Sequence, residues 1–186
     1  RFRERDLQPE APVALCLCAG LVSDTLNLTS PTTTDVDRDM LVWLSELAGV
    51  DADEFAEAFF ASGSLLLHAD AQAIVGTDRK EFNEDGVFLS LSQVEETSFK
   101  GLSKRQEELV EELERLRHEY RYELCAILVT DIRRHDSVLL AVGLEDLLCK
   151  LPFTRSGVNE FSAPGVVSRK KQLFPAVCEA IRLRSD

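Results

Sequence analysis

The stretch Leu-Cys-Ala-Ile-Leu-Val-Thr-Asp at residues 124–131 decides the fold. Its first six residues are all apolar, and Thr130 and Asp131 end the run with polar side chains. A continuous apolar run of this length is typical of a central strand of a sheet. A second apolar run follows at residues 137–142, after a charged turn at residues 133–136. The two runs together predict a β-hairpin.

A further strand is predicted before this hairpin. Apolar residues recur at every second position from Val87 to Leu91. Such alternation is typical of a half-buried strand, which has one face in the core and one in solvent. The segment before it, residues 77–82, is expected to lead into a turn at residues 83–86.

Helical spacing of apolar residues marks several other segments. The clearest helix is predicted over residues 103–120, where Ser103 and Gln106 have the spacing of a capping box. A capping motif at Thr34 and a stop at Gly49 predict another helix. Shorter helices are expected from Asp51 to Gly63, near Glu145 to Lys150, and at the end of the chain around Val177, Ala180 and Ile181. Strands flanked by helices predict an α/β fold with a mixed central β-sheet.

The overall charge argues against two broad classes of partner. In this chain of 186 residues, 33 acidic residues outnumber 21 basic ones and give a net charge of −12. Nucleic acids and anionic membranes are bound through broad basic surfaces, so neither is an expected partner. No apolar segment reaches the roughly 20 residues that a membrane-spanning helix needs. The sequence therefore predicts a soluble protein that is large enough to bury a core.

Cysteine usage bears on the cellular compartment. The chain has five cysteines, an odd number, and no Cys-x-x-Cys pair. Most of them lie in apolar stretches, and their spacing does not fit a zinc finger or a disulfide framework. Reduced thiols and a cytoplasmic location are therefore predicted.

The most informative polar segment is Ser-Arg-Lys-Lys-Gln at residues 168–172. Three adjacent cations in an acidic chain, beside an expected helix start, favour a local site for a small and highly charged anion such as phosphate. Pro175 favours the first turn of a helix, which leaves open whether the cations lie in that turn or in the preceding loop. A solvated run of surface charge is the alternative interpretation.

Other polar residues are candidates with equally simple alternatives. Asp24 ends an apolar run, where a carboxylate could cap a helix or bind a cation. Lys80 could contact phosphate as a point charge or lie exposed in a turn. Asp131 could belong to a site or form a turn. The three histidines are far apart and form no metal-ligand pair, and no complete catalytic set of residues is evident.

Several short motifs occur along the chain in a defined order. They are Ser23-Asp24-Thr25-Leu26, Ser30-Pro31-Thr32-Thr33-Thr34, Asp78-Arg79-Lys80-Glu81-Phe82, Gln93-Val94-Glu95, Val129-Thr130-Asp131-Ile132, and Pro164-Gly165-Val166-Val167-Ser168-Arg169-Lys170-Lys171-Gln172. From about Ala11 to Arg182 this series resembles the manganese-dependent (family II) inorganic pyrophosphatases of the DHH phosphoesterase superfamily. The last motif is the most specific of them.

The resemblance implies a role for particular residues. In that family an N-terminal DHH domain holds paired manganese ions, and a C-terminal DHH-associated domain closes over the substrate with basic side chains. The resemblance implies that Asp24 is a metal ligand and that Lys80, Arg169 and Lys170 bind the phosphates of the substrate. No catalytic residue is assigned.

The resemblance also implies a domain organisation. Residues 1–30 are expected to be the C-terminal remnant of the DHH catalytic domain with its linker, and residues 31–186 the DHH-associated substrate-binding domain. The DHH signature and the remaining metal ligands do not occur in the sequence. The chain is therefore expected to be the substrate-binding part of an enzyme, with little or no activity alone.

The implied function is hydrolysis of pyrophosphate to two phosphates, with Mn²⁺ as the cofactor of the complete enzyme. A homodimer is expected for the complete protein, and a monomer for this part alone. Two alternatives remain open. One is an exopolyphosphatase or phosphodiesterase of the same superfamily, and the other is a non-catalytic module that binds phosphate anions.

Overall fold

The computed structural model describes residue 2 and residues 5–185, and it divides the chain into two compact units. The first unit spans Arg1–Gly63 and the second Ser64–Asp186. Each unit has its own hydrophobic cluster or clusters, so each is described by itself.

The first unit consists of helices that pack around a small core. Its helices are α1 (Ala11–Thr25), α2 (Asp35–Ala48) and α3 (Ala52–Gly63). At the start of α2, Thr34 Oγ1 accepts a hydrogen bond from the Asp37 amide at 3.4 Å, and the Asp37 carboxylate accepts one from the Thr34 amide at 2.8 Å. This capping box and the left-handed Gly49 after α2 confirm the predicted helix boundaries.

The second unit contains a mixed sheet with helices before, within and after it. Its elements are α4 (Leu65–His68), α5 (Ala71–Gly76), β1 (Lys80–Glu84), β2 (Val87–Glu96), α6 (Leu102–Tyr120), β3 (Leu124–Asp131), β4 (Asp136–Gly143), α7 (Glu145–Leu148), β5 (Thr154–Arg155), β6 (Glu160–Pro164), the π-helical turn η2 (Arg169–Leu173) and α8 (Phe174–Ser185). The strand order is β1-β2-β3-β4-β6-β5. Strands β2 and β3 are parallel and are joined through α6, and the other neighbouring strands are antiparallel.

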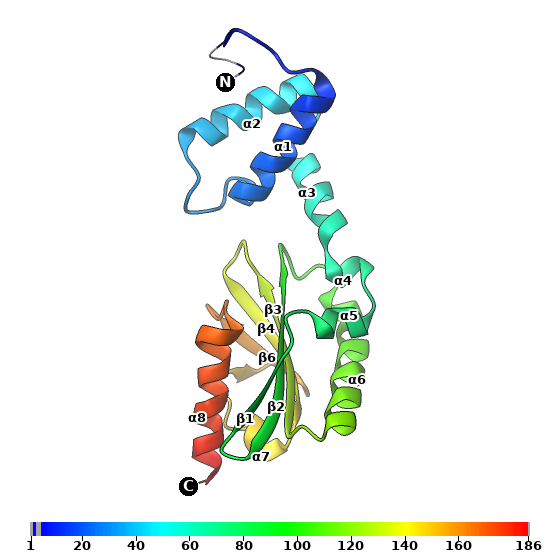
Figure 1. Ribbon diagram of the computed structural model, residues 1–186, viewed down its shortest axis with the longest axis vertical. Helices are drawn as coiled ribbons and strands as arrows, with labels where there is room; N and C mark the ends of the chain where they lie inside the picture. Colours follow the sequence, from blue (N-terminus) through cyan, green and yellow to red (C-terminus); the bar gives the residue numbers. More distant parts are fainter. Residues whose placement is uncertain (1, 3–4, 186) are drawn as a thin grey trace. The chain divides into compact units, whose positions relative to one another are not determined.

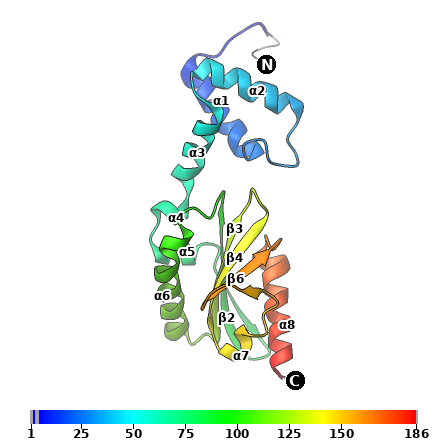
Figure 2. The ribbon, with the colours of Figure 1, turned by 180° about the vertical axis from the view of Figure 1, so that it is seen from behind.

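Helices cover both faces of this sheet, as Figures 1 and 2 show from opposite sides. On one face α8 and α7 pack against a cluster that includes Leu91, Leu128 and Val177. On the other face α5 and α6 pack against a cluster that includes Ile127 and Leu113. Every residue of β3 is buried, as the apolar run predicts. The predicted α/β fold with a mixed central sheet is confirmed.

The predicted hairpin and most of the helices are present, but three local predictions are wrong. Strand β2 is buried on both faces, not half-buried, because helices cover the sheet on both sides. Residues 80–84 form strand β1, and the turn is confined to Asp85 and Gly86, whose φ angles of +50° and +82° suit a tight hairpin. Helix α6 begins after Gly101 without a side-chain cap, so the capping box at Ser103 does not form.

Strands β5 and β6 were not expected from the sequence, because Pro, Gly and Ser punctuate residues 152–165 and hide the short apolar alternation. The helix predicted near residues 145–150 is present as α7, and the final helix as α8. All five cysteines are free thiols. No helix within the described residues is long and apolar enough to cross a membrane.

In the sequence, the boundary between the two compact units lies between Gly63 and Ser64. The domain organisation implied by the resemblance has its boundary between residues 30 and 31. Helices α2 and α3 pack with α1 in the first unit, through side chains such as Leu41, Leu44 and Ala56. Packing describes compactness and does not assign a helix to a family domain. The boundary at residue 30 therefore stays a prediction.

Candidate phosphate-binding site

The candidate site lies where the parallel strands β2 and β3 end, on the face of the sheet that α8 covers. In open α/β sheets ligands commonly bind outside the carboxyl ends of parallel strands. Gln93 of β2, Thr130 of β3 and Ser137 of β4 project toward the loop that follows β6. That loop leads directly into η2 and α8, so the polar strand ends lie beside residues 168–172, hereafter the basic segment.

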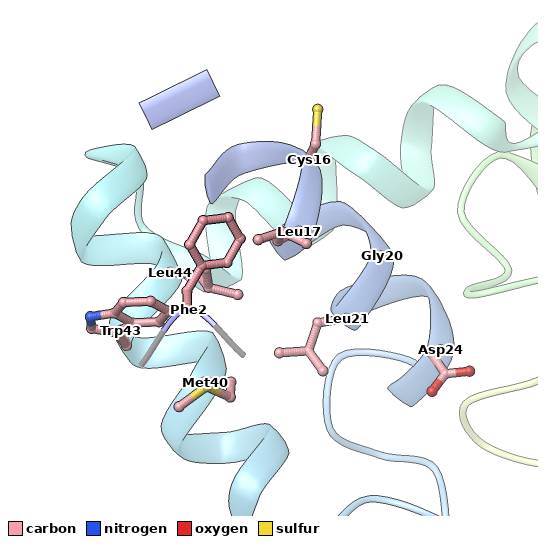
Figure 3. Close-up of a pocket in the computed structure, with 9 residues that line it drawn as sticks. All are labelled: Phe2, Cys16, Leu17, Gly20, Leu21, Asp24, Met40, Trp43 and Leu44. Atoms are coloured by element: carbon pink, nitrogen blue, oxygen red, sulfur yellow. The ribbon is translucent and has the colours of Figure 1, made fainter. Parts of the chain in front are cut away.

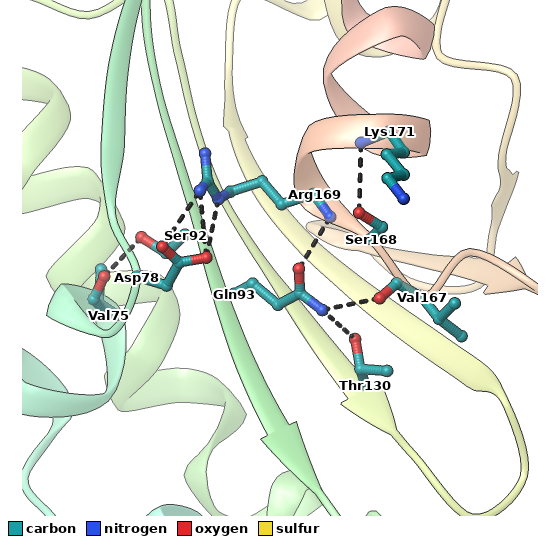
Figure 4. Close-up of polar contacts among 9 residues, drawn as sticks. All are labelled: Val75, Asp78, Ser92, Gln93, Thr130, Val167, Ser168, Arg169 and Lys171. Carbon is teal, nitrogen blue, oxygen red and sulfur yellow. Dashed lines mark hydrogen bonds and ion pairs between the residues drawn. The ribbon is translucent and has the colours of Figure 1, made fainter.

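Gln93 attaches this basic segment to the sheet. Its amide Nε2 donates hydrogen bonds to the Val167 carbonyl at 3.0 Å and to Thr130 Oγ1 at 3.2 Å. Its Oε1 accepts one from the Arg169 amide at 2.8 Å (Figure 4). Gln93 is buried, so these partners offset the free energy lost when a side-chain amide leaves water. The backbone of residues 167–169 is thereby fixed on β2.

Two further side chains hold the loop before the basic segment. Ser137 Oγ donates to the Val166 carbonyl and lies 3.0 Å from Thr130 Oγ1. Gln172 accepts a hydrogen bond from the Val167 amide at 2.9 Å and donates to the Gly165 carbonyl at 2.8 Å. The loop is therefore bonded both to the strands and to the helical turn that follows it.

The basic segment is helical from its first cation, Arg169. Ser168 Oγ accepts a hydrogen bond from the Lys171 amide at 3.2 Å and caps η2, which continues without a break into α8. The open question of loop or helix is thus resolved: the cations lie in the first turn of a helical segment, one turn before Pro175. Cations at a helix N-terminus oppose the helix dipole, so this arrangement becomes favourable when an anion lies beside them.

The three cations of the segment have different surroundings. Arg169 is buried, with 7% of its surface exposed, whereas Lys170 and Lys171 are exposed. Within residues 5–185 no carboxylate forms an ion pair with either lysine. Figure 4 shows the Lys171 side chain pointing away from the Arg169 guanidinium. The interpretation as a solvated charge run is therefore wrong for Arg169. It fits the exposed Lys171, to which the resemblance assigns no role.

Arg169 forms an ion pair with Asp78. Its Nε donates to Asp78 Oδ2 at 3.3 Å, and its Nη2 donates to both carboxylate oxygens at 3.1 Å (Figure 4). No described residue accepts a hydrogen bond from Nη1. This ion pair joins the motif at residues 78–82 to the motif at residues 168–172, which are about 90 residues apart in the sequence.

Lys80 lies close to this ion pair in the chain and on the same face of the sheet. It is the first residue of β1 and is paired in register with Leu91, whose side chain belongs to the α8 side of the core. Side chains alternate along a strand, and Phe82 of β1 stacks on Phe174 of α8 with ring centroids 4.1 Å apart. The exposed Lys80 side chain therefore lies on the face that carries Arg169.

Arg79, the residue between Asp78 and Lys80, points to the opposite face. Its guanidinium lies 5.5 Å from the centre of the Tyr120 ring, and its Nη2 lies 3.0 Å from Glu81 Oε1. In the same region burial, and then the nearby Glu81 carboxylate, raises the pKa of Tyr122 to about 12. Burial also raises the pKa of the Cys125 thiol to about 12. These groups lie under α6 and do not contribute to the candidate site.

Asp24 lies in the first unit, in the last turn of α1. Helix α1 ends on Leu26, whose left-handed backbone forms the C-cap, so the interpretation of Asp24 as a helix cap is wrong. The exposed Asp24 carboxylate borders a largely apolar pocket of about 620 Å³ that includes Leu17 and Trp43 (Figure 3). The described part of the chain contains no group of three His, Cys, Asp or Glu side chains that could hold a metal ion. A single carboxylate does not form a metal site by itself.

The remaining candidate, Asp131, forms a turn. Its Oδ1 accepts hydrogen bonds from the amides of Arg133 at 3.0 Å and Arg134 at 3.1 Å. Such bonds start the turn between β3 and β4. Asp131 thus has a structural role that accounts for its burial.

Sequence reasoning did not single out Asp78 or Gln93 as individual site residues. Both carried a signal that could have identified them. Gln93 continues the strand face of Leu89 and Leu91, where a buried polar side chain needs partners. Asp78 stands directly before two cations, Arg79 and Lys80. Neither signal names the partner, because the partners come from a distant part of the sequence.

Known proteins similar to this chain support the resemblance seen in its motifs. The manganese-dependent inorganic pyrophosphatase of Bacillus subtilis (strain 168) is 31% identical over 181 residues, which are 97% of this chain and 59% of that protein. A cobalt-dependent inorganic pyrophosphatase of Clostridium perfringens is 30% identical over 185 residues, or 99% of this chain and 34% of that protein. The chain therefore spans about three fifths of the first relative and one third of the second.

A solved structure and a family model agree with these relatives. A crystal structure from Methanococcus jannaschii is described as that of a candidate family II inorganic pyrophosphatase. The match covers 94% of this chain and 57% of the chain in that crystal structure, with a TM-score of 0.60 and 30% sequence identity. The predicted resemblance to family II pyrophosphatases is thus confirmed. The model of the DHHA2 domain matches residues 57–180, which include β1, β2 and the basic segment, and the chain therefore belongs to the DHHA2 domain family.

Proposed function

We propose that this chain binds pyrophosphate through Lys80, Arg169 and Lys170 as the substrate-binding part of a manganese-dependent inorganic pyrophosphatase. The observation that carries the proposal is the ion pair between Asp78 and Arg169, which brings the two basic motifs together on one face of the sheet. The names of the relatives support pyrophosphate as the substrate.

The three side chains suit the two ends of a diphosphate. A guanidinium presents a planar set of donors that matches phosphate oxygens, and Arg169 has Nη1 available for them. The ammonium groups of Lys80 and Lys170 act as flexible point charges that neutralise the remaining oxygens. A diphosphate bound at both ends has a fixed orientation. This orientation lowers the entropic barrier to an in-line attack on phosphorus.

The metal part of the function rests on a different unit. We propose Asp24 as one ligand of Mn²⁺, and its exposed carboxylate is of the ligand type that this metal prefers. Because the described residues include no three-ligand group, they do not form a manganese site on their own. The 186-residue chain is therefore expected to show little or no hydrolysis of pyrophosphate with added Mn²⁺. A turnover rate close to that of a complete enzyme would contradict this expectation.

The composition and the free thiols bear on the cellular location and the partners of the protein. We propose a cytoplasmic location and no nucleic-acid or membrane partner, in line with the net charge of −12 and the free thiols. A homodimer is proposed for the complete protein and a monomer for this chain. Light scattering measures the oligomeric state directly.

Titration calorimetry with sodium pyrophosphate tests the binding proposal. We expect Arg169→Ala, Lys170→Ala and Lys80→Ala each to weaken binding about tenfold or more, because each removes a charge-assisted contact. Lys104→Ala is the matched control, since Lys104 is an exposed cation on α6, across the sheet from the site. If all four variants weakened binding equally, pyrophosphate would be attracted by the general positive charge and not by this site, and the binding proposal would be wrong.

The same titration separates the substrates of related hydrolases. Tripolyphosphate and a dinucleotide, titrated in parallel, represent the exopolyphosphatase and phosphodiesterase alternatives. Tighter binding of either than of pyrophosphate would favour that alternative. Binding of pyrophosphate without turnover in the complete protein would favour a non-catalytic anion-binding module.

A further inference from the structure

The Asp78 carboxylate occupies one edge of the guanidinium that the proposed function assigns to phosphate. Resting on that proposed function, we infer that Asp78 is a positioning residue, which fixes Arg169 so that its Nη1 edge is presented to the anion. Two opposed effects are possible for a carboxylate at this place. It orders the arginine, and it repels the substrate.

The position of Asp78 is set by an unusual turn between α5 and β1. Its φ of +43° lies in the left-handed region, which aspartate and asparagine tolerate better than most residues. The Thr77 amide donates to the Ile74 carbonyl at 3.1 Å, and the Gln93 amide donates to the Thr77 carbonyl at 3.3 Å. Ser92 Oγ donates to the Val75 carbonyl and ties the end of α5 to β2 (Figure 4). The backbone immediately before Asp78 is therefore hydrogen-bonded both to α5 and to β2.

Arg169 is held at both of its ends. Its backbone amide is bonded to Gln93, and its guanidinium to Asp78 through Nε and Nη2. An arginine side chain has many rotamers, and restricting them before the ligand arrives removes part of the entropy loss on binding. The Arg169 side chain is 8% exposed and the Asp78 side chain 54% exposed, so the carboxylate lies at the solvent boundary of the pair. The geometry thus leaves the arginine ordered and Nη1 without a described partner.

Removing the Asp78 charge distinguishes ordering of Arg169 from repulsion of the substrate, because the two effects change the affinity for pyrophosphate in opposite directions. If the carboxylate acts only as a nearby negative charge, Asp78→Asn strengthens the binding of pyrophosphate. If it positions Arg169, the same variant weakens binding, because one of two acceptor oxygens and the charge of the pair are lost. Asparagine keeps the size of the side chain and tolerates the left-handed backbone, so the turn is preserved.

Asp85→Asn is the matched control. Asp85 is also exposed and also has a left-handed backbone, with φ of +50°, but it lies in the turn between β1 and β2 and forms no ion pair within the described chain. Calorimetry with sodium pyrophosphate is expected to show about tenfold weaker binding for Asp78→Asn and a change below about twofold for Asp85→Asn. Equal or tighter binding by Asp78→Asn would overturn the inference and leave the proposed function intact.

A double-mutant cycle with Arg169→Ala tests whether Asp78 acts through the arginine. Once Arg169 is absent, Asp78→Asn is expected to have no weakening effect. The same loss in both backgrounds would contradict a positioning role. Absence of pyrophosphate binding by the unaltered chain would instead overturn the proposed function, and this inference with it.

NMR of the unaltered protein gives a test that needs no variant and no ligand. The Arg169 Nε–Hε signal is expected to be visible and protected from exchange with water, unlike the signals of exposed arginines such as Arg121 and Arg133. Asp78→Asn is expected to remove that protection, and Asp85→Asn to keep it. A rapidly exchanging Arg169 signal in the unaltered protein would show that the arginine is not held, and would overturn the inference.

Discussion

The segment Asp78-Arg79-Lys80 separates two polar regions on opposite faces of one sheet, and the two regions are built differently. On the α8 face, Gln93, Thr130 and Ser137 are buried and hydrogen-bonded to one another or to the basic segment. On the α6 face the buried polar groups are paired less uniformly: Ser92 Oγ donates to the Val75 carbonyl, but other groups have no partner in the described part of the chain. There, Arg79 Nη1, Ser90 Oγ and Tyr122 OH find no hydrogen-bond partner within the described residues.

The difference indicates which polar groups order the protein. A satisfied buried network fixes the groups that it joins, whereas an unpaired buried group reduces stability without fixing anything. The proposed phosphate-binding side chains are attached to the satisfied network. The positions of Arg169 and of the loop before it should therefore depend on a few residues of β2, β3 and β4, and hardly at all on the polar groups under α6.

Gln93→Leu is expected to have the largest effect on stability and binding, because it removes the centre of the network on the α8 face. Leucine has a similar volume, but it leaves the Arg169 amide and the Val167 carbonyl buried without their partners. We expect a loss of about 3 kcal/mol in the free energy of unfolding, and pyrophosphate binding weakened by more than about tenfold. Urea denaturation and calorimetry measure the two effects.

Gln93→Glu serves as the control for Gln93→Leu, since it keeps the acceptor oxygen for the Arg169 amide. A Gln93→Leu protein with unchanged stability and unchanged binding would show that the backbone of the basic segment is fixed by other contacts.

A matched pair of serines compares the two faces directly. Ser137 and Ser90 are both buried in strands, but Ser137 Oγ donates to the Val166 carbonyl and Ser90 Oγ has no hydrogen-bond partner among the described residues. Ser137→Ala should reduce the free energy of unfolding by about 1–2 kcal/mol, and Ser90→Ala should leave it unchanged or increase it slightly. Thermal and urea denaturation of the two variants, measured side by side, check this. Equal losses would mean that the two faces are solvated alike.

How far the sequence predicts this molecule depends on whether the signal is local. The run at residues 124–131 predicted a central strand correctly, because burial on both faces needs apolar side chains throughout. The capping box at Thr34 predicted the start of α2, since its two hydrogen bonds are three residues apart. Strands β5 and β6 escaped prediction, because short edge strands depend on their neighbours more than on their own composition.

The candidate site shows the same limit. Its basic segment is visible in the sequence as a local cluster of charge. The ion pair of Asp78 with Arg169 is not, because its partners meet only after the sheet and α8 have packed. The roles of Lys80, Arg169, Lys170 and Asp24 came from the family resemblance and stay predictions.

The smallest predicted effect concerns the α6 face at high pH. Burial raises the pKa of the Cys125 thiol to about 12, compared with 9.0 for an ordinary thiol. A raised pKa in the folded state means that the neutral thiol contributes its stability fully below pH 9, and that this contribution is lost as the pH rises toward 12. We expect the free energy of unfolding to fall by about 1 kcal/mol between about pH 8 and about pH 9.7 because of this group.

Cys125→Ala isolates that contribution, because alanine cannot ionise and its unfolding free energy should fall less steeply over the same range. Cys16→Ala is the control, since the Cys16 thiol is exposed. Parallel slopes for Cys125→Ala and the unaltered protein would mean that the buried thiol is solvated after all. A flatter slope would instead extend the comparison of the two faces to ionisable groups: polar groups on the α8 face are held by partners, whereas the Cys125 thiol under α6 stays neutral because it is buried.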